Sequence, residues 1–227
     1  MIWYDYYYLV LVVPAIIISL FAQINVKRTY SKMARVLNQR GITGDMAAQR
    51  VLSYYNINNV RIEQTHGKLS DHYDPRGNVI RLSPEVYSGR SIASVGIACH
   101  EAGHAAQHAQ NYAPIKIRNT VLPVANIGSS MGFTIGIIGY FLGFELLVSV
   151  GIILFSAVVA FQLITLPVEF NASRRAMKVI AETAMLVDDE NAKARKVLTA
   201  AAMTYVAALL VSIMSLLRLI LRTNRRN

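Results

Sequence analysis

Two histidines and a glutamate in this sequence have the residue types and the spacing of a metal-dependent hydrolase. They form the run His100-Glu101-Ala102-Gly103-His104, an instance of H-E-x-x-H. Residues four apart on an α-helix face the same way, about one turn or ~5.4 Å apart. Two imidazoles at that spacing can bind one Zn²⁺ at ~2.0–2.1 Å each, and the glutamate between them can act as a general base. The motif predicts His100 and His104 as metal ligands and Glu101 as the catalytic group, against the alternative of two surface histidines on an ordinary helix.

A catalytic zinc site normally has three protein ligands and leaves a fourth position for water. His108 continues the spacing, but about 12 Å of helix rise separates it from His100, so we expect it at the surface or beside a ligand. Glu169 is the other candidate. It follows Pro167, a residue that suits the first turn of a new helix. From the residues alone, Glu169 is either the third ligand or a glutamate stabilised by a helix N-terminus.

The elements around the motif are short. A helix is predicted from about Ser91 to Gln110, and another from Thr43 with Asp45 as its N-cap. Residues 59–64 and 78–82 alternate polar and apolar side chains, which is typical of strands. These elements predict a small packed α+β lobe that holds the motif helix.

Four apolar runs in the chain are long enough to cross a membrane. A bilayer core needs about twenty mostly apolar residues in a helix, and the runs are residues 8–26, 121–143, 146–166 and 198–217. Hydrophobic residues make up 54% of the chain and charged residues 16%, below the ~25% charged residues of ordinary soluble domains. No positive charge precedes the first run, so we interpret it as a retained anchor and not as a signal peptide. The second and third runs predict a helical hairpin.

Basic residues predict the orientation. Lys27, Arg28, Lys32 and Arg35 follow the first run and Asp5 precedes it, so the N-terminus should face outward and residues 27–120 and 167–197 should be cytosolic. An even number of crossings separates His104 from Glu169, so both lie on one side of the membrane. The arginines after the fourth run break the rule if that run crosses fully; they are Arg218, Arg222, Arg225 and Arg226.

Composition excludes other classes. The single cysteine, Cys99, excludes an intrachain disulfide framework and a cysteine-built zinc finger. The net charge of +10 is explained by basic residues beside the apolar runs, and no basic face or motif indicates nucleic acid binding.

Two segments resemble a known family. The run SVGIACHEAGHAAQH, a following membrane hairpin and then LPVEFNASRRA resemble the YugP-type membrane zinc metallopeptidases, bacterial relatives of the HtpX-like gluzincins. The resemblance extends over nearly the whole chain. It implies one catalytic zinc ion bound by His100, His104 and Glu169, with Glu101 as acid and base. The family pattern is Glu-Phe-Asp-Ala-Ser, whereas this chain has Asn171 at the aspartate position, which removes a negative charge there.

The expected fold class is a mainly α membrane protein, with about four transmembrane helices and a small cytosolic zincin-like α+β domain. The expected parts follow in order: an anchor at 1–26, the cytosolic domain with the motif at 27–120, a transmembrane hairpin at 121–166, a cytosolic helix with the third ligand at 167–197, and a transmembrane helix with a basic tail at 198–227.

The predicted function is a zinc endopeptidase in a bacterial inner membrane that cleaves proteins or peptides, membrane proteins among them, at the cytosolic face. Its oligomeric state is not predicted. Asn171, Ser173, Arg174 and Arg175 are candidates to support the ligands or an oxyanion, although both arginines also fit as cytosolic flanking charges. The strand near residues 79–82 could hold substrate by strand addition, by family analogy.

Two alternatives stay open at this point. An intramembrane protease would place the motif within the bilayer, but the residues around His100 form too short an apolar run to span one. A non-catalytic membrane scaffold with a structural zinc site would need four protein ligands.

Overall fold

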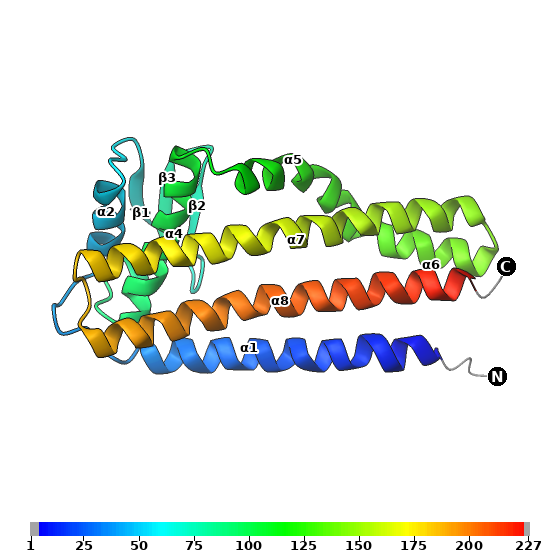
Figure 1. Cartoon of the computed structure of the whole chain (residues 1–227), viewed down its shortest axis with the longest axis horizontal. Helices are drawn as coiled ribbons and strands as arrows, with labels where there is room; N and C mark the ends of the chain where they lie inside the picture. Colours follow the sequence, from blue (N-terminus) through cyan, green and yellow to red (C-terminus); the bar gives the residue numbers. More distant parts are fainter. Residues whose placement is uncertain (1–4, 225–227) are drawn as a thin grey trace. The chain divides into compact units, whose positions relative to one another are not determined.

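The computed structural model describes residues 5–224, and most of them are helical (Figure 1). Four helical segments are long and apolar enough to cross a membrane. They are Tyr8–Met33, Ala113–Leu142, Glu145–Glu182 and Asp188–Thr223. The four predicted apolar runs lie in these segments, apart from the last residue of the second run, so the prediction of about four membrane-length helices is confirmed.

The described residues form two compact units. The apolar unit contains residues 5–23, 116–167 and 203–224, and the mixed unit contains residues 24–115 and 168–202. Both H-E-x-x-H histidines and Glu169 belong to the mixed unit.

The long helices have these bounds. A π-helical turn at Tyr8–Val12 leads into α1, Val13–Met33. Helix α5, Ala113–Ile127, continues through a π-helical turn at Gly128–Gly132 into α6, Phe133–Leu142. Helix α7 is Glu145–Glu182 and α8 is Asp188–Asn224.

Within the apolar unit, the arginines that follow the fourth apolar run have a carboxylate partner. Asp5 Oδ2 lies 2.7 Å from Arg218 Nη2 and 2.7 Å from Arg222 Nη1. The Arg218 guanidinium also lies 4.9 Å from the ring centre of Tyr8, and that of Arg222 lies 4.4 Å from the ring centre of Tyr140. These contacts offset part of the positive charge at this end of α8. The predicted tail residues Arg225 and Arg226 lie outside the described residues.

The prediction that Pro167 begins a new helix is wrong. Helix α7 continues through it without interruption from Glu145 to Glu182. Proline removes one backbone N–H and usually kinks or ends a helix, but the flanking turns here keep the helix intact. Glu169 therefore lies deep inside a long helix and not in a first turn. The alternative that a helix N-terminus stabilises Glu169 is therefore wrong, because no helix begins at Pro167.

The mixed unit contains the remaining elements, which pack together in Figure 1. Their bounds are α2 Gly44–Tyr54, β1 Arg61–Gln64, β2 His72–Asp74, β3 Val79–Leu82, α3 Pro84–Tyr87 and α4 Ile92–Ala109.

The predicted motif helix is α4, and Ser91 is its N-cap, with its hydroxyl accepting from the Ser94 N–H. The predicted N-cap of α2 is wrong by two positions. Thr43 has the extended backbone of a cap, and Asp45 lies in the first turn, where it accepts from the Thr43 hydroxyl.

The three strands form one sheet in the order β1-β3-β2. Strand β3 pairs in parallel with β1 and antiparallel with β2, so both of its edges are occupied. The expectation that residues 79–82 hold substrate by strand addition is therefore wrong, because an added strand needs a free edge. The free edges belong to β1 and β2, and β2 was not predicted as a strand.

One glycine sets how closely α4 approaches α7. A Cβ on Gly103 would lie 2.7 Å from the carbonyl oxygen of Ala172, closer than real contacts allow. The absence of a side chain lets the two backbones come together, with Ala102, Ala172 and Ala176 buried nearby. The glycine inside H-E-x-x-H thus has a packing role in bringing α7 to the histidines.

We predict that Gly103→Ala destabilises the protein by about 1–3 kcal/mol, because the new methyl group must push α7 away from α4. Gly96→Ala in the same helix is the matched control, since its Cβ would meet Ala194 Cβ at an ordinary 3.9 Å. That control should be neutral or should gain up to ~1 kcal/mol of helix propensity. Thermal unfolding in detergent measures both variants, and equal melting temperatures would contradict the close-packing role.

Candidate metal centre

Helices α4 and α7 bring three ligand-type side chains to one point. The nearest Glu169 oxygen, Oε2, lies 3.3 Å from His100 Nε2 and 3.7 Å from His104 Nε2. The ligand atoms of the three residues all lie within 4.8 Å of one another. The centres of the two imidazole rings are 4.7 Å apart, with an interplanar angle of 85°. Both rings direct Nε2 toward the carboxylate. This is the cluster that the motif and the resemblance predicted.

The cluster is partly shielded from solvent. The Glu169 side chain is 5% exposed, whereas those of His100 and His104 are 16% and 13% exposed. Burial acts to lower the pKa of His104, but the hydrogen bond that the ring donates to Glu169 and the charges of Glu101 and Glu169 outweigh it, and the pKa of His104 is raised. The buried carboxylate therefore stabilises the protonated form of His104.

Each histidine is held by its other ring nitrogen. His100 Nδ1 lies 3.1 Å from Ser173 Oγ on α7, and His104 Nδ1 lies 3.0 Å from Gln107 Oε1, three residues along α4. A second hydrogen bond of this kind fixes the ring orientation and the tautomer of a metal-binding histidine. Ser173, one of the predicted supporting residues, thus hydrogen-bonds the His100 ring.

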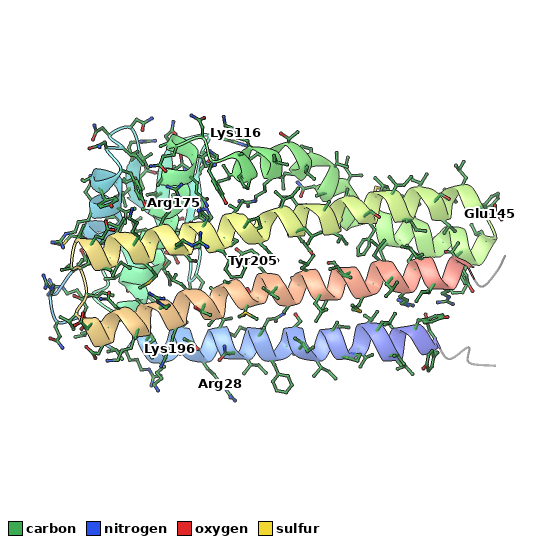
Figure 2. All side chains as sticks on the ribbon, in the orientation of Figure 1. Arg28, Lys116, Glu145, Arg175, Lys196 and Tyr205 are labelled. Carbon is green, nitrogen blue, oxygen red and sulfur yellow. The ribbon has the colours of Figure 1, made fainter. Side chains whose placement is uncertain are left out.

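Hydrogen bonds link four side chains in series from Arg175 through Asn171 and Gln107 to His104. Because Arg175 can only donate, it fixes which atom donates and which accepts in each of the other bonds. Arg175, labelled in Figure 2, can only donate, and its Nε donates to Asn171 Oδ1 at 2.7 Å. Gln107 Nε2 donates to the same oxygen at 3.0 Å and to the Val168 carbonyl at 2.7 Å. The Gln107 oxygen therefore faces His104 and accepts from Nδ1–H. When the ring is neutral, the lone pair is therefore on Nε2, the nitrogen that faces Glu169.

Asn171 does not contact the ligand residues directly and reaches His104 through Gln107. It contacts Gln107 and Arg175, and Gln107 contacts His104. The amide oxygen accepts both hydrogen bonds that a carboxylate would accept at this position. The substitution relative to the family pattern therefore removes a negative charge beside Arg175 while keeping the geometry that holds Gln107.

Glu101 is held by the sheet. The backbone N–H of Tyr73 on β2 donates to Glu101 Oε2 at 3.1 Å. Because β2 is an edge strand, this contact places the glutamate of the motif beside a free strand edge.

Other candidates lie away from the ligand atoms. His108 packs against the ring of Tyr73, with 5.4 Å between ring centres, and is not in the ligand cluster. Arg175 is committed to Asn171 and Gln110 and lies 5.5 Å from the ring centre of Tyr55. Arg174 is exposed and has no hydrogen bond or ion pair with any residue from 5 to 224.

Sequence reasoning missed two contributors. Gln107 is fully buried, and its position one turn after His104 is the signal that could have identified it. The Tyr73 N–H gives no signal in the sequence, because its role depends on which edge of β2 stays unpaired.

The donor set fits a zinc ion. Two imidazole Nε2 atoms and one buried carboxylate oxygen are ligands that Zn²⁺ prefers. Three such ligands within 4.8 Å need only small side-chain shifts to bind one ion. The described residues supply no fourth ligand to this group, which is the composition of an open site.

Comparison with known proteins agrees with this chemistry. Residues 8–224 match the family described as "Putative neutral zinc metallopeptidase", and the chain belongs to this family. A protein of Bacillus subtilis (strain 168) named "Putative membrane protease YugP" is 44% identical over 214 residues, which cover 94% of this chain and 95% of that protein. The resemblance inferred from the sequence is thus confirmed. No solved structure matches the chain.

We predict that zinc affinity falls as the pH is lowered. A raised pKa means that His104 keeps its proton to a higher pH, and zinc must displace that proton to bind. Below this pKa the apparent affinity should fall about tenfold per pH unit for each proton displaced. Competition with a chelating dye between about pH 5 and 8, corrected for protonation of the dye, measures the slope. An affinity independent of pH would contradict the assignment.

Gln107→Met should weaken zinc binding by about tenfold to a hundredfold, because His104 loses the acceptor that orients its ring. Gln49→Met is the matched control, since Gln49 is exposed on α2 and lies outside the cluster. The same chelator competition compares the two variants. Equal zinc affinity in both would show that Gln107 does not position the ligand.

Proposed function

We propose that this chain is a membrane-anchored zinc endopeptidase that hydrolyses peptide bonds in protein substrates at the cytosolic face of a bacterial inner membrane. The membership in a zinc metallopeptidase family and the membrane-length helices support the coarse part of this proposal. The convergence of two imidazole nitrogens and the Glu169 carboxylate from α4 and α7 is the observation that carries it.

In this proposal His100, His104 and Glu169 bind one zinc ion. When bound, Zn²⁺ supplies Lewis acidity, which polarises a carbonyl group and acidifies water. Glu101 takes one proton from the attacking water as the oxygen adds to the peptide carbonyl carbon. It then delivers that proton to the leaving nitrogen as the carbon–nitrogen bond breaks. The Tyr73 N–H holds the Glu101 carboxylate in place for both transfers.

The edge of β2 offers a place for an extended substrate. Strand β2 pairs with β3 on one side, and the Tyr73 N–H points to Glu101. Glu101 accepts from the Tyr73 N–H, so a peptide that adds to the remaining positions of this edge would lie beside the glutamate that must reach its scissile bond. This replaces the predicted use of residues 79–82 and suits unfolded segments of proteins, membrane proteins among them.

The location of the motif supports a site outside the bilayer. Helix α4 is not among the four membrane-length helices of the described residues, and it packs against α2 in a core with Leu52, Ile80 and Ile92. The basic residues after α1 and on the second half of α7 favour the cytosolic side for this unit. An intramembrane protease would need the motif on a membrane-length helix, and none of the four such helices of residues 5–224 carries it.

A scaffold with a structural zinc ion is disfavoured by the ligand count. A structural site closes the metal with four protein ligands, and the described residues bring three together. The free edge of β2 and the fixed carboxylate beside it have no use in a closed site.

Glu101→Gln tests the proposal. The variant should keep about one zinc per chain and lose roughly 10²–10⁴-fold in peptide cleavage, since the amide cannot take the proton. Glu63→Gln is the matched control, because Glu63 is a half-exposed carboxylate on β1 that pairs with Arg61 and is not a member of the cluster. Metal analysis and cleavage of an unfolded protein such as casein are measured on the same purified samples.

Undiminished cleavage by pure Glu101→Gln protein would refute the role of Glu101. Zinc retained in Glu169→Ala at wild-type affinity would refute the ligand set. Wild-type protein that binds zinc but cleaves nothing in a broad set of unfolded and membrane substrates would favour the scaffold.

A further inference from the structure

Next to the metal cluster, the mixed unit has a groove of about 530 Å³ between α7 and α8. One face of each helix lines it. On α7 the lining residues include Phe170, Ser173, Arg174 and Lys178, and on α8 they include Arg195 and Ala202. The spacing of three and four residues on both helices shows that a continuous strip of each helix faces the groove.

The charge of the groove is positive and largely uncompensated. Arg174, Lys178 and Arg195 line it, and no carboxylate does among the described residues. Within residues 5–224, Arg174 and Arg195 make no ion pair, and Lys178 reaches Glu182 only at 3.9 Å, with both side chains about half exposed. Such a pair contributes little, so the three cations are available to an anion.

The groove also has an apolar end, and the chain places it next to the membrane-length runs. Phe170 lies three residues after Pro167, where the apolar run of α7 ends, and Ala202 lies inside the apolar run of α8. Lys178 and Arg195 lie nearer the turn at residues 183–187 that joins the two helices. On both helices the cations therefore lie farther from the apolar runs than Phe170 and Ala202 do, and Met177 and Ala181 of α7 also line the groove.

We propose that this groove binds an anionic phospholipid, with the phosphate held by Arg174, Lys178 and Arg195 and the first part of an acyl chain against Phe170 and Ala202. A phosphate diester matches a cluster of three cations of which only Lys178 has an acidic partner, at 3.9 Å. Apolar residues beside the membrane-length runs and cations farther along both helices match a molecule that is apolar at one end and charged at the other. A soluble anion would leave the apolar end without a function.

The groove adjoins the metal cluster through one residue. Ser173 lines the groove, and its hydroxyl lies 3.1 Å from His100 Nδ1. A lipid in the groove would thus contact the side chain that orients one of the two histidines. Lipid binding itself requires neither zinc nor cleavage, so it can be tested separately from the proposed function.

The test uses the full chain in a neutral detergent, titrated with dihexanoyl phosphatidylglycerol, with dihexanoyl phosphatidylcholine and with glycerol phosphate. Isothermal titration calorimetry should show one phosphatidylglycerol site per chain and much weaker binding of the other two. Replacing two cations in R174Q/R195Q should weaken phosphatidylglycerol binding roughly tenfold to thirtyfold. Thr199→Phe, which fills the groove without changing its charge, should weaken it as well.

The matched control is K27Q/R28Q on α1. It removes two exposed basic residues just after an apolar run but outside the groove, and Arg28 projects away from the neighbouring helices in Figure 2. This control should bind phosphatidylglycerol like wild type, and thermal unfolding checks that every variant is folded.

Equal losses of phosphatidylglycerol binding in the control and in R174Q/R195Q would overturn the proposal in favour of general surface charge. Glycerol phosphate binding as tightly as the lipid would overturn it in favour of a soluble anion, and unchanged binding in Thr199→Phe would overturn the groove as the location.

Discussion

The central constraint on this structure is a carboxylate kept almost entirely out of water. Glu169 is 4% exposed and has two imidazoles within 4 Å, so its charge must be compensated by a proton or by a cation. Most of the mixed unit serves this placement. Gly103 lets α7 approach α4, the uninterrupted passage of α7 through Pro167 sets the position of Glu169, and the motif spacing presents both rings to it.

The histidines are oriented by groups that carry no ligand atoms. A donor-only guanidinium at Arg175 fixes the Asn171 amide, which fixes Gln107, which accepts from His104. Because each amide in this series has one possible orientation, the tautomer of His104 follows without any assumption about the metal. A carboxylate at position 171 would serve equally as an acceptor. The Asn171 oxygen fixes the orientation of Gln107 by accepting its hydrogen bond, which needs no negative charge.

The features predicted correctly from the sequence were those that depend on residue spacing or on the length and number of apolar runs. The motif spacing predicted the ligand helix, the lengths of the apolar runs predicted four long helices, and the parity of crossings placed Glu169 with His104. The parts that failed depended on three-dimensional context. Pro167 is tolerated inside α7 because neighbouring turns hold the helix, and β3 is central because β2, a three-residue strand without clear alternation, pairs with it. Gln107 was missed because a glutamine is usually exposed, and its burial here depends on the approach of α7, whose Val168 carbonyl and Asn171 side chain accept from it.

The pairing of Asp5 with Arg218 and Arg222 joins residues that are more than two hundred positions apart. A ribosome synthesises Asp5 more than two hundred residues before Arg218 and Arg222, so this contact cannot form until both arginines have been made. A chain cut short before Arg218 would keep every residue of the metal cluster and still lack the link that ties its first helix to its last.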